Sequence, residues 1–592
     1  MRPIAVCLSV ALAIFSLAEA EASVIRVDAG KGETIQAAAD KAAPGDVVLV
    51  APGVYYESVI IRNFGLPGRP VVFRSEVPGK AVVTCARKDV REGKVKWRLD
   101  DAETGLYSIP YEGTDYPARL LYGRTDLYPY ASLEGLKTFT LKKAMSKSVS
   151  VDVHGPRHGY FWSKDEQRLY VRLHASGKYG NPDPNAHVMC AGPEPDGVSY
   201  GCFTPTAESK SCFRVLCGAE DHRAAPNGWP AYVEIEGFRI ETPSLAGVYT
   251  EASDVTVRNC RFLGCRLGVS GDGRFDRVGY YRRCANRVRV TGCGYTQYPT
   301  YEDGIELVEA ATNRSEKLFW HRKHANEGLP GKRFIYESGI IGWAALDWEV
   351  DHCKMVSCFE GISAKGATMS EGLRVHDNVF ERMLDNAIEF EDSAQNVSFC
   401  NNIVRDVFSP VSWQPLRGRP LPGPCYVYGN TFYNTPEFCR VFDFRKPGVF
   451  KIMGPEFGKI VWPGVTIFNN TIYWARGWPI FGGAATGHHP DRISFCYNVV
   501  AADHCFTTAM LEPETCPAFT IRGNVVGAVD ERVFASARMA GDGGLALEDA
   551  SKLGLKDPEH GDFSLKPNSP ARGRGGPVEG VDFSFKHAGA WQ

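Results

Sequence analysis

Two glutamates separated by a single residue, Glu389 and Glu391, have a spacing suited to acid–base chemistry on a sheet. Side chains two positions apart on a β-strand point to the same face, and their backbones lie about 6.6 Å apart. Cleavage of a glycosidic bond usually needs two carboxyl groups that flank the bond, one as the acid and one as the base or nucleophile. This pair therefore predicts a hydrolytic site, and its spacing favours inversion over retention.

The two glutamates belong to a pattern that recurs along the chain. Residues 304–308, 361–365, 387–391 and 410–414 align with alternating apolar and polar positions, and 441–445 is a looser fifth copy. If the apolar columns face a core, the period of two sends the other side chains outward. One outward column then contains Glu306, Ser363, Glu389, Ser412 and Asp443, and the next contains Val308, Lys365, Glu391, Gln414 and Arg445.

Candidate binding residues surround these carboxylates. An aromatic face can stack on a sugar ring, and cationic side chains bind acidic groups. We therefore expect Trp413, Arg445 and Lys365 to position an acidic or sulfated sugar, and Trp320 in a basic segment to act as a second platform. Glu306, about 10 Å from Glu389 by strand spacing, is the reserve carboxylate. We also expect Asp303 and Asp443 to bind the substrate, and further acids near the same strands are Glu302, Asp385 and Asp392.

The elements that position these residues are short strands of a repeating coil. An apolar residue, two variable residues and Asn recur with the Asn at 378, 402, 430, 470, 498 and 524, and Cys takes the Asn place at 260, 293 and 353. The segments before these positions alternate apolar and polar residues, as half-buried strands do. Most copies lie 24–28 residues apart, which predicts an all-β solenoid, a parallel β-helix. In that fold each inward Asn at a turn can bond the next one along the stack.

Residues 34–76, TIQAAADKAAPGDVVLVAPGVYYESVIIRNFGLPGRPVVFRSE, support the same fold. Their first part reads as a short helix entered at Thr34, and a strand and turn follow. The segment resembles the N-terminal capping helix and first coils of right-handed parallel β-helix proteins of the pectin-lyase-like superfamily. The resemblance implies the fold, and it leaves the reaction open because that superfamily includes lyases, hydrolases, epimerases and adhesins.

A second resemblance suggests a different reaction. Residues 360–365, EGISAK, are similar to a motif of the chondroitinase-B and alginate lyase family. By this resemblance Lys365 would be the base that removes the proton at C5 of a uronic acid, and Glu360 would help to bind calcium. Cys358 stands where that motif has another acidic ligand, and Glu391 stands where we expect the family's Arg. The hydrolytic interpretation requires no cofactor.

Composition and the N-terminal sequence limit the possible partners and location of the protein. The chain has 592 residues and a formal net charge of −2, so it carries no electrostatic signature of nucleic-acid binding. Residues 1–20 read as a signal peptide, and no later apolar run is long enough to span a membrane, which predicts a secreted or periplasmic protein. We expect most of the 18 cysteines to be buried thiols. The better disulfide candidates are Cys202, Cys212 and Cys217.

Five segments follow from the pattern. We expect a signal peptide (1–20), the cap and first coils of the β-helix (21–85), an inserted β-rich module (86–228), the β-helix core (229–530) and a C-terminal capping tail (531–592). The insert interrupts the repeat with many aromatic residues and one clear strand at 168–172, and it could wall one end of a groove. The tail closes the last coil, whose open end is otherwise an unpaired edge.

These observations predict an enzyme that acts on a polysaccharide or oligosaccharide, an acidic one in the more specific interpretation, by paired-carboxylate hydrolysis on an outer sheet face. Two alternatives stay open: a calcium-dependent polysaccharide lyase with Lys365 as the base, and a non-catalytic glycan-binding or surface β-helix. The sugar, the linkage and the oligomeric state do not follow from the sequence.

Overall fold

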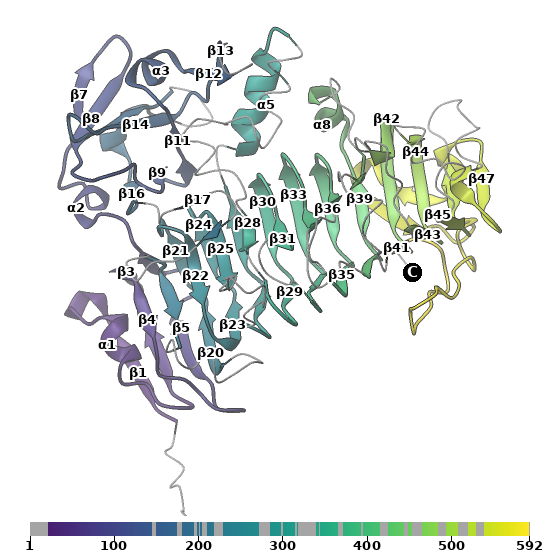
Figure 1. Cartoon of the computed structure of the whole chain (residues 1–592), viewed down its shortest axis with the longest axis horizontal. Helices are drawn as coiled ribbons and strands as arrows, with labels where there is room; N and C mark the ends of the chain where they lie inside the picture. Colours follow the sequence, from purple (N-terminus) through teal and green to yellow (C-terminus); the bar gives the residue numbers. More distant parts are fainter. Residues whose placement is uncertain are drawn as a thin grey trace, which may run out of the picture.

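The computed structural model describes residues 22–144, 150–174, 180–194, 198–199, 202–203, 210–217, 229–271, 285–297, 300–313, 317, 339–342, 344–364, 371–391, 395–414, 424–442, 448–452, 464–482, 493–506, 519–527 and 538–590. The predicted signal peptide lies outside this part of the chain. Within it the chain winds into stacked coils (Figure 1). Most coils contribute one strand to each of three faces, and the strands within a face are parallel to one another. The predicted parallel β-helix is therefore confirmed.

Face 1 is a sheet of 13 parallel strands. In spatial order its strands are β1 (Val24–Val27), β2 (Val47–Val50), β5 (Val71–Ser75), β20 (Pro230–Glu236), β23 (Ser253–Arg258), β26 (Arg289–Thr291), β29 (Glu349–Asp351), β32 (Arg374–His376), β35 (Val397–Cys400), β38 (Cys425–Tyr428), β41 (Val465–Phe468), β43 (Ile493–Cys496) and β45 (Phe519–Arg522).

Face 2 follows face 1 in every coil. Its strands are β3 (Gly53–Tyr56), β6 (Ala81–Thr84), β21 (Arg239–Glu241), β24 (Arg261–Leu263), β27 (Gly294–Thr296), β30 (Lys354–Cys358), β33 (Val379–Met383), β36 (Ile403–Val407), β39 (Thr431–Tyr433), β42 (Thr471–Gly482), β44 (Val499–Phe506), β46 (Val525–Gly527) and β47 (Leu545–Leu547).

Face 3 closes most of the coils. Its strands are β4 (Val59–Ile61), β19 (Phe213–Val215), β22 (Ala246–Thr250), β25 (Leu267–Gly271), β28 (Gly339–Gly342), β31 (Ile362–Ala364), β34 (Ile388–Glu391), β37 (Val411–Gln414) and β40 (Phe450–Ile452). The long strand β42 then bends from face 2 onto face 3, where Phe481 pairs with Phe450 of β40.

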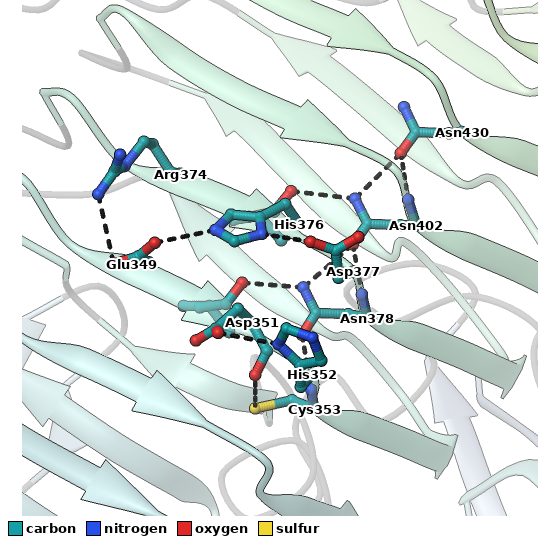
Figure 2. A network of polar contacts seen from close by, with 12 residues as sticks. Glu349, Asp351, His352, Cys353, Arg374, His376, Asp377, Asn378, Asn402 and Asn430 are labelled. Atoms are coloured by element: carbon teal, nitrogen blue, oxygen red, sulfur yellow. Dashed lines mark hydrogen bonds and ion pairs between the residues drawn. The ribbon is translucent and has the colours of Figure 1, made fainter. Parts of the chain in front are cut away.

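The core fills the inside of the coils, and a buried asparagine ladder runs along the corner between faces 1 and 2. Asn402 donates its side-chain amide to Asn430 Oδ1 at 3.0 Å and accepts from the Asn378 amide at 3.0 Å (Figure 2). The same bonds continue through Asn470 and Asn498 to Asn524. The predicted ladder is confirmed, and it holds the register of successive coils.

The residue before each ladder position has a left-handed backbone conformation. Asp377 has φ 56° and Asn401 has φ 55°, values that Asn and Asp tolerate better than most residues. Glycine takes the same place at Gly429 and Gly523. This sharp turn points the next side chain inward. In the sequence, the corner is therefore marked by a turn-forming residue followed directly by Asn.

The N-terminal cap is also confirmed. Helix α1 (Ile35–Ala39) begins after Thr34, whose hydroxyl accepts from the Ala37 N–H at 3.1 Å. The carboxylate of Glu57 accepts from two further amides of the first turn, those of Ile35 and Gln36. Helix α1 therefore covers the first coil, and the backbone N–H groups of Ile35, Gln36 and Ala37 in its first turn have hydrogen-bond acceptors.

The insert forms its own sheets beside the N-terminal coils (Figure 1). A five-stranded sheet has the order β11–β14–β15–β8–β7 and a three-stranded sheet the order β10–β9–β16. Among its described residues, two strand pairs, two short α-helices and the 3-10 helix η2 (Pro184–Ala186) complete it. The bounds are α2 (Lys88–Arg91), β7 (Arg98–Asp101), β8 (Leu106–Pro110), β9 (Leu120–Tyr122), β10 (Thr125–Asp126), β11 (Tyr128–Pro129), α3 (Leu133–Thr138), β12 (Thr140–Ala144), β13 (Ser150–His154), β14 (Gly159–Ser163), β15 (Arg168–Arg172), β16 (Met189–Ala191), β17 (Val198–Ser199) and β18 (Cys202–Phe203).

The ends of the insert and of the core differ from the predicted boundaries. The β-helix resumes at β19, which pairs with β4 and β22, and not at residue 229. At the other end β47 still pairs with β46, so the coils continue into the predicted tail. Both strands are only three residues long, too short for alternation in the sequence to reveal them. After β47 the chain adds a hairpin of β48 (Leu555–Asp557) and β49 (Asp562–Leu565).

Two helices project from the core coils. Helix α5 (Thr300–Ala310) lies between the insert and helix α8 (Pro436–Val441) along one side of the molecule (Figure 1). Arg440 of α8 contacts Glu309 of α5 at 3.4 Å. None of the described helices has the length and apolar character that crossing a membrane requires.

Candidate functional site

Three acidic side chains, Glu360, Asp385 and Glu389, meet where face 2 turns into face 3. One carboxylate oxygen of each lies within 4.8 Å of the others. Glu360 lies in the corner between β30 and β31, Asp385 in the next corner between β33 and β34, and Glu389 in β34 itself. We call these three residues the acidic cluster.

The strand register explains why Glu389 can reach the two corners. Ile388 and Phe390 belong to the central core, so alternation along β34 places Glu389 on the outer side of the coil. The corners before β31 and β34 are stacked, because the Asp385 N–H donates to the Phe359 carbonyl at 2.9 Å and the Gly361 N–H donates to the Asn386 carbonyl at 3.0 Å. Two successive coils therefore supply the three acids.

All three side chains are buried despite their charge. Their residues are 1%, 9% and 0% exposed for Glu360, Asp385 and Glu389. Carboxylate oxygens brought this close together on successive coils can act as ligands of one cation. The acidic cluster is the arrangement among the described residues that best suits a bound cation.

The donor set fits calcium. Calcium binds carboxylate oxygens at 2.3–2.6 Å, so two oxygens on the same ion lie at most about 5 Å apart. The 4.8 Å limit within the acidic cluster agrees with this value.

The outer column through Glu389 partly matches the prediction. Glu389 pairs with Ser363 on one side and Ser412 on the other, as the sequence alignment placed them. Glu391 pairs with Gln414 in backbone register, also as predicted, but its side chain is not among those described. Lys365, Asp443, Arg445 and Trp320 lie outside the described residues, so their predicted roles stay predictions.

The predicted placement of Glu306 on a strand of face 3 is wrong. Glu306 lies in helix α5 and not on a strand of face 3, and it contacts Arg157 of the insert at 3.3 Å. The strand that precedes β31 on this face is β28, where Ile341 pairs with Ile362. The segment Gly304–Val308 alternates over too few residues to exclude a helix, and the spacing of Ile305 and Val308 also fits one helical face. Asp303 belongs to the same helix.

Two further predicted placements are wrong. Trp413 is 5% exposed and packs in the central core, so it offers no face to a sugar. Strand β40 takes the place on face 3 where the alignment put residues 441–445, and its Lys451 pairs with Ser412. Helix α8 ends at Val441, the first residue of that segment, and residues 443–445 lie outside the described part of the chain.

Two residues of this face were not given a role from the sequence. Asp385 was named only among the further acids, and its closeness to Glu360 follows from the stacking of the two corners. Lys451 is two strands from Glu389 in the same outer column, about 10 Å away by strand spacing. Strand β40 alternates apolar and polar residues over only three positions, which is too short a pattern to predict it from the sequence.

A second group of charged residues lies on face 1 and is internally paired (Figure 2). His376 contacts Glu349 at 3.0 Å and Asp377 at 2.7 Å, and Asp351 contacts Arg289 at 2.8 Å. Burial alone lowers the pKa of His376, but hydrogen bonds to Asp377 and Glu349 outweigh it and raise the pKa. Burial alone raises the pKa of Asp351, but bonds from Arg289 and His352 lower it to about 2. These residues link adjacent coils of face 1.

Comparisons with known proteins agree with the fold. Residues 232–433 match the family described as right handed beta helix region, and no curated protein sequence matches the chain. Similar solved structures include XylC with xylose (12% identity, TM-score 0.44, 85% of this chain and 83% of that chain). An alginate lyase from Paenibacillus sp. str. FPU-7 has 12% identity and TM-score 0.35, with 80% and 99% covered. A family 28 exopolygalacturonase from Yersinia enterocolitica has 12% identity and TM-score 0.36, with 83% and 80% covered. The three-faced coil and the family match together identify the chain as a right-handed parallel β-helix protein.

Proposed function

We propose that this chain is a polysaccharide-cleaving enzyme of the lyase type, which acts on a uronate-containing polymer with a divalent cation, calcium by preference, in the acidic cluster. The observation that carries the proposal is the meeting of three buried carboxylates, Glu360, Asp385 and Glu389, within 4.8 Å. Carboxylate oxygens are the ligands that calcium prefers, and a bound cation would let this face accept a polyanionic substrate.

The chain's own residues have distinct roles in this proposal. Glu360, Asp385 and Glu389 would hold the cation, which when bound would neutralise the carboxylate of a uronic acid and so make its C5 proton more acidic. Lys365 is the proposed base, by the resemblance of the 360–365 motif, and would accept that proton. Lys451, on the same outer column as Glu389, would orient a neighbouring acidic group of the polymer.

A second candidate function is hydrolysis, and a different feature of the cluster favours it. Retaining glycosidases place their two carboxyl groups only about 5–5.5 Å apart. The oxygens of Asp385 and Glu389 lie within 4.8 Å. In this alternative Asp385 replaces Glu391 as the partner of Glu389, and the stereochemical outcome changes from inversion to retention.

The test is to incubate the purified mature protein with pectate, alginate and glycosaminoglycans, with calcium or with a chelator. Reducing ends and ultraviolet absorbance from unsaturated uronate are followed together. Lyase activity predicts that both signals rise with calcium and that the chelator abolishes both. Reducing ends without absorbance would favour the hydrolase, and binding without either product would favour a non-catalytic glycan-binding protein.

Variants assign the activity to the acidic cluster. Glu360→Gln, Asp385→Asn and Glu389→Gln should each lower the calcium-dependent rate by about 100-fold or more, because each removes a charged ligand. Glu306→Gln is the matched control, since Glu306 lies on helix α5 and contacts Arg157. Full activity in all three cluster variants would reject this site.

A further inference from the structure

The insert replaces one corner of the β-helix. In the first coil, Glu57 and Ser58 connect β3 to β4. In the second coil, Cys85 follows β6 and Cys212 precedes β19, and they take the places of these two residues. The register shows this directly, because Thr84 pairs with Tyr56 and Phe213 pairs with Val59. Two residues that are consecutive in the first coil are thus 127 positions apart in the second.

The two cysteines of this corner face each other. Their sulfur atoms are 3.8 Å apart. Cys85 Sγ also contacts the Glu57 carbonyl at 3.7 Å, and Cys212 Sγ contacts the Val83 and Glu241 carbonyls at 3.5 Å. Strand pairing on both sides fixes the two backbones, so the thiols are held together by the coil stack and not by a loop of the insert.

We propose that Cys85 and Cys212 form a disulfide bond that closes the base of the insert. A disulfide has a sulfur–sulfur distance of about 2.05 Å, so the sulfurs must approach by about 1.8 Å, a movement that rotation about the Cα–Cβ bonds can supply. The bond would take the place of the peptide link that joins Glu57 to Ser58 in the first coil.

The accessibility of the two thiols suits oxidation by an external disulfide. Cys85 is partly exposed, whereas Cys212 is buried. The Cys85 thiolate attacks one sulfur of glutathione disulfide and releases one glutathione thiol. Cys212 then gives up its proton and attacks the Cys85 sulfur of the mixed disulfide, which releases the second glutathione thiol. Two protein thiols are oxidised and one glutathione disulfide is reduced.

The ladder cysteines provide a contrast within the same protein. Cys260, Cys293 and Cys353 are stacked along the corner between faces 1 and 2, and all are buried. Their sulfurs contact backbone carbonyls, as Cys260 does with Arg258 at 3.4 Å. With no exposed member, this group offers an external disulfide no point of attack.

The experiment is peptide mapping of the full chain after equilibration with glutathione disulfide. Free thiols are alkylated under denaturing conditions without reductant, and the protein is digested with trypsin. Cleavage after Lys80, Arg87, Lys210 and Arg214 isolates residues 81–87 and 211–214, each with one cysteine. We expect the two peptides to appear as one linked species, lighter by two hydrogen atoms than their sum, and to separate after reduction. The ladder cysteines should be alkylated throughout.

A second measurement distinguishes the effect of the disulfide bond on the melting temperature from the effect of side-chain packing. Reductant should lower the melting temperature of the oxidised wild type by about 5 °C and leave that of Cys85→Ser/Cys212→Ser unchanged. The comparison is made within each variant, so a packing cost of the serines does not affect it. Complete alkylation of both cysteines after treatment with excess glutathione disulfide would overturn the proposal, and so would a link from either one to another cysteine.

Discussion

At the scale of single residues, the acidic cluster is defined by charge and burial together. Glu360, Asp385 and Glu389 occupy positions that the sequence marks only as scattered acids. What distinguishes them is that their carboxylate oxygens lie within 4.8 Å of one another. If a cation binds there, as proposed, the folded protein should be more stable with the cation than without it.

The cluster predicts opposite effects of one substitution in these two states. In the presence of a chelator, Glu360→Gln should raise the melting temperature, because it removes one of three repelling charges. With millimolar calcium, the wild type should be stabilised and the variant should not, because ligand binding to the folded state stabilises only if the site is intact. Calorimetry with chelator and with calcium measures both effects.

A purely structural cluster would behave differently. Glu360→Gln would then destabilise the protein equally in both solutions, and calcium would leave the wild type unchanged. Glu306→Gln is again the control, because its carboxylate is half exposed on helix α5 and should not alter the response to calcium.

His376 gives a second prediction at the residue scale. Its pKa is raised in the folded protein by Asp377 and Glu349, so the charged imidazole stabilises the fold. This contribution is fully present below the unfolded pKa of about 6.5 and is lost as the pH rises through the higher folded value. The free-energy difference of unfolding between wild type and His376→Gln should therefore be larger at pH 5.5 than at pH 9, by chemical denaturation. If wild type and variant differ by the same free energy of unfolding at both pH values, the charged imidazole does not stabilise the fold.

At the scale of elements, the asparagine ladder fixes the register of the coils. The sequence revealed this part of the fold because one residue type recurs with a nearly constant spacing, and the pairings of β32, β35 and β38 follow from it. The candidate site was harder to predict, since it depends on corners and short strands of three to five residues. Alternation over such lengths fits α5 as well as a strand, which is why Glu306 was misplaced.

The ladder predicts a large cost for a single side chain. Asn402→Ala removes the bonds that Asn402 makes to Asn378, to Asn430 and to the Val375 carbonyl, and it leaves buried polar groups without partners. We expect a loss of about 3 kcal/mol in the free energy of unfolding. Ser398→Ala on the outer side of β35 is the control, with an expected change below about 0.5 kcal/mol. Denaturant titration measures both, and similar small losses would mean that the ladder carries little stability.

At the scale of the whole molecule, the insert packs partly on itself and partly on the coils. The insert has a hydrophobic core of its own, with Trp97, Tyr160 and Leu169 among its members. Its contact with the coils includes Leu121 on Leu263 and the pair Arg91–Glu241 at 3.1 Å. The insert enters and leaves at one corner, so its removal leaves the order of the stacked strands intact, but it also removes Leu106, Tyr130 and Tyr170 from the central hydrophobic cluster.

Deletion of residues 86–211, which joins Cys85 directly to Cys212, should therefore give a folded β-helix. The new bond restores the corner that Glu57 and Ser58 form in the first coil. We expect retention of the β-sheet circular dichroism and of a cooperative thermal transition, with lower solubility because Leu263 loses its cover. A deletion of 86–228, the boundary that the sequence suggested, also removes β19 and should fail to fold. If both deletions fold equally well, β19 is dispensable.

The position of the insert also delays the pairing of one strand during synthesis. Strand β4 belongs to the first coil, yet its partner β19 follows 154 positions later, as the pairing of Ile60 with Arg214 shows. Until the ribosome has produced that strand, the edge of β4 is an open template for incorrect pairing. The nascent chain therefore has to keep its first coil unfinished while the entire insert is translated, and residues 59–61 are where chaperone protection during biogenesis would matter most.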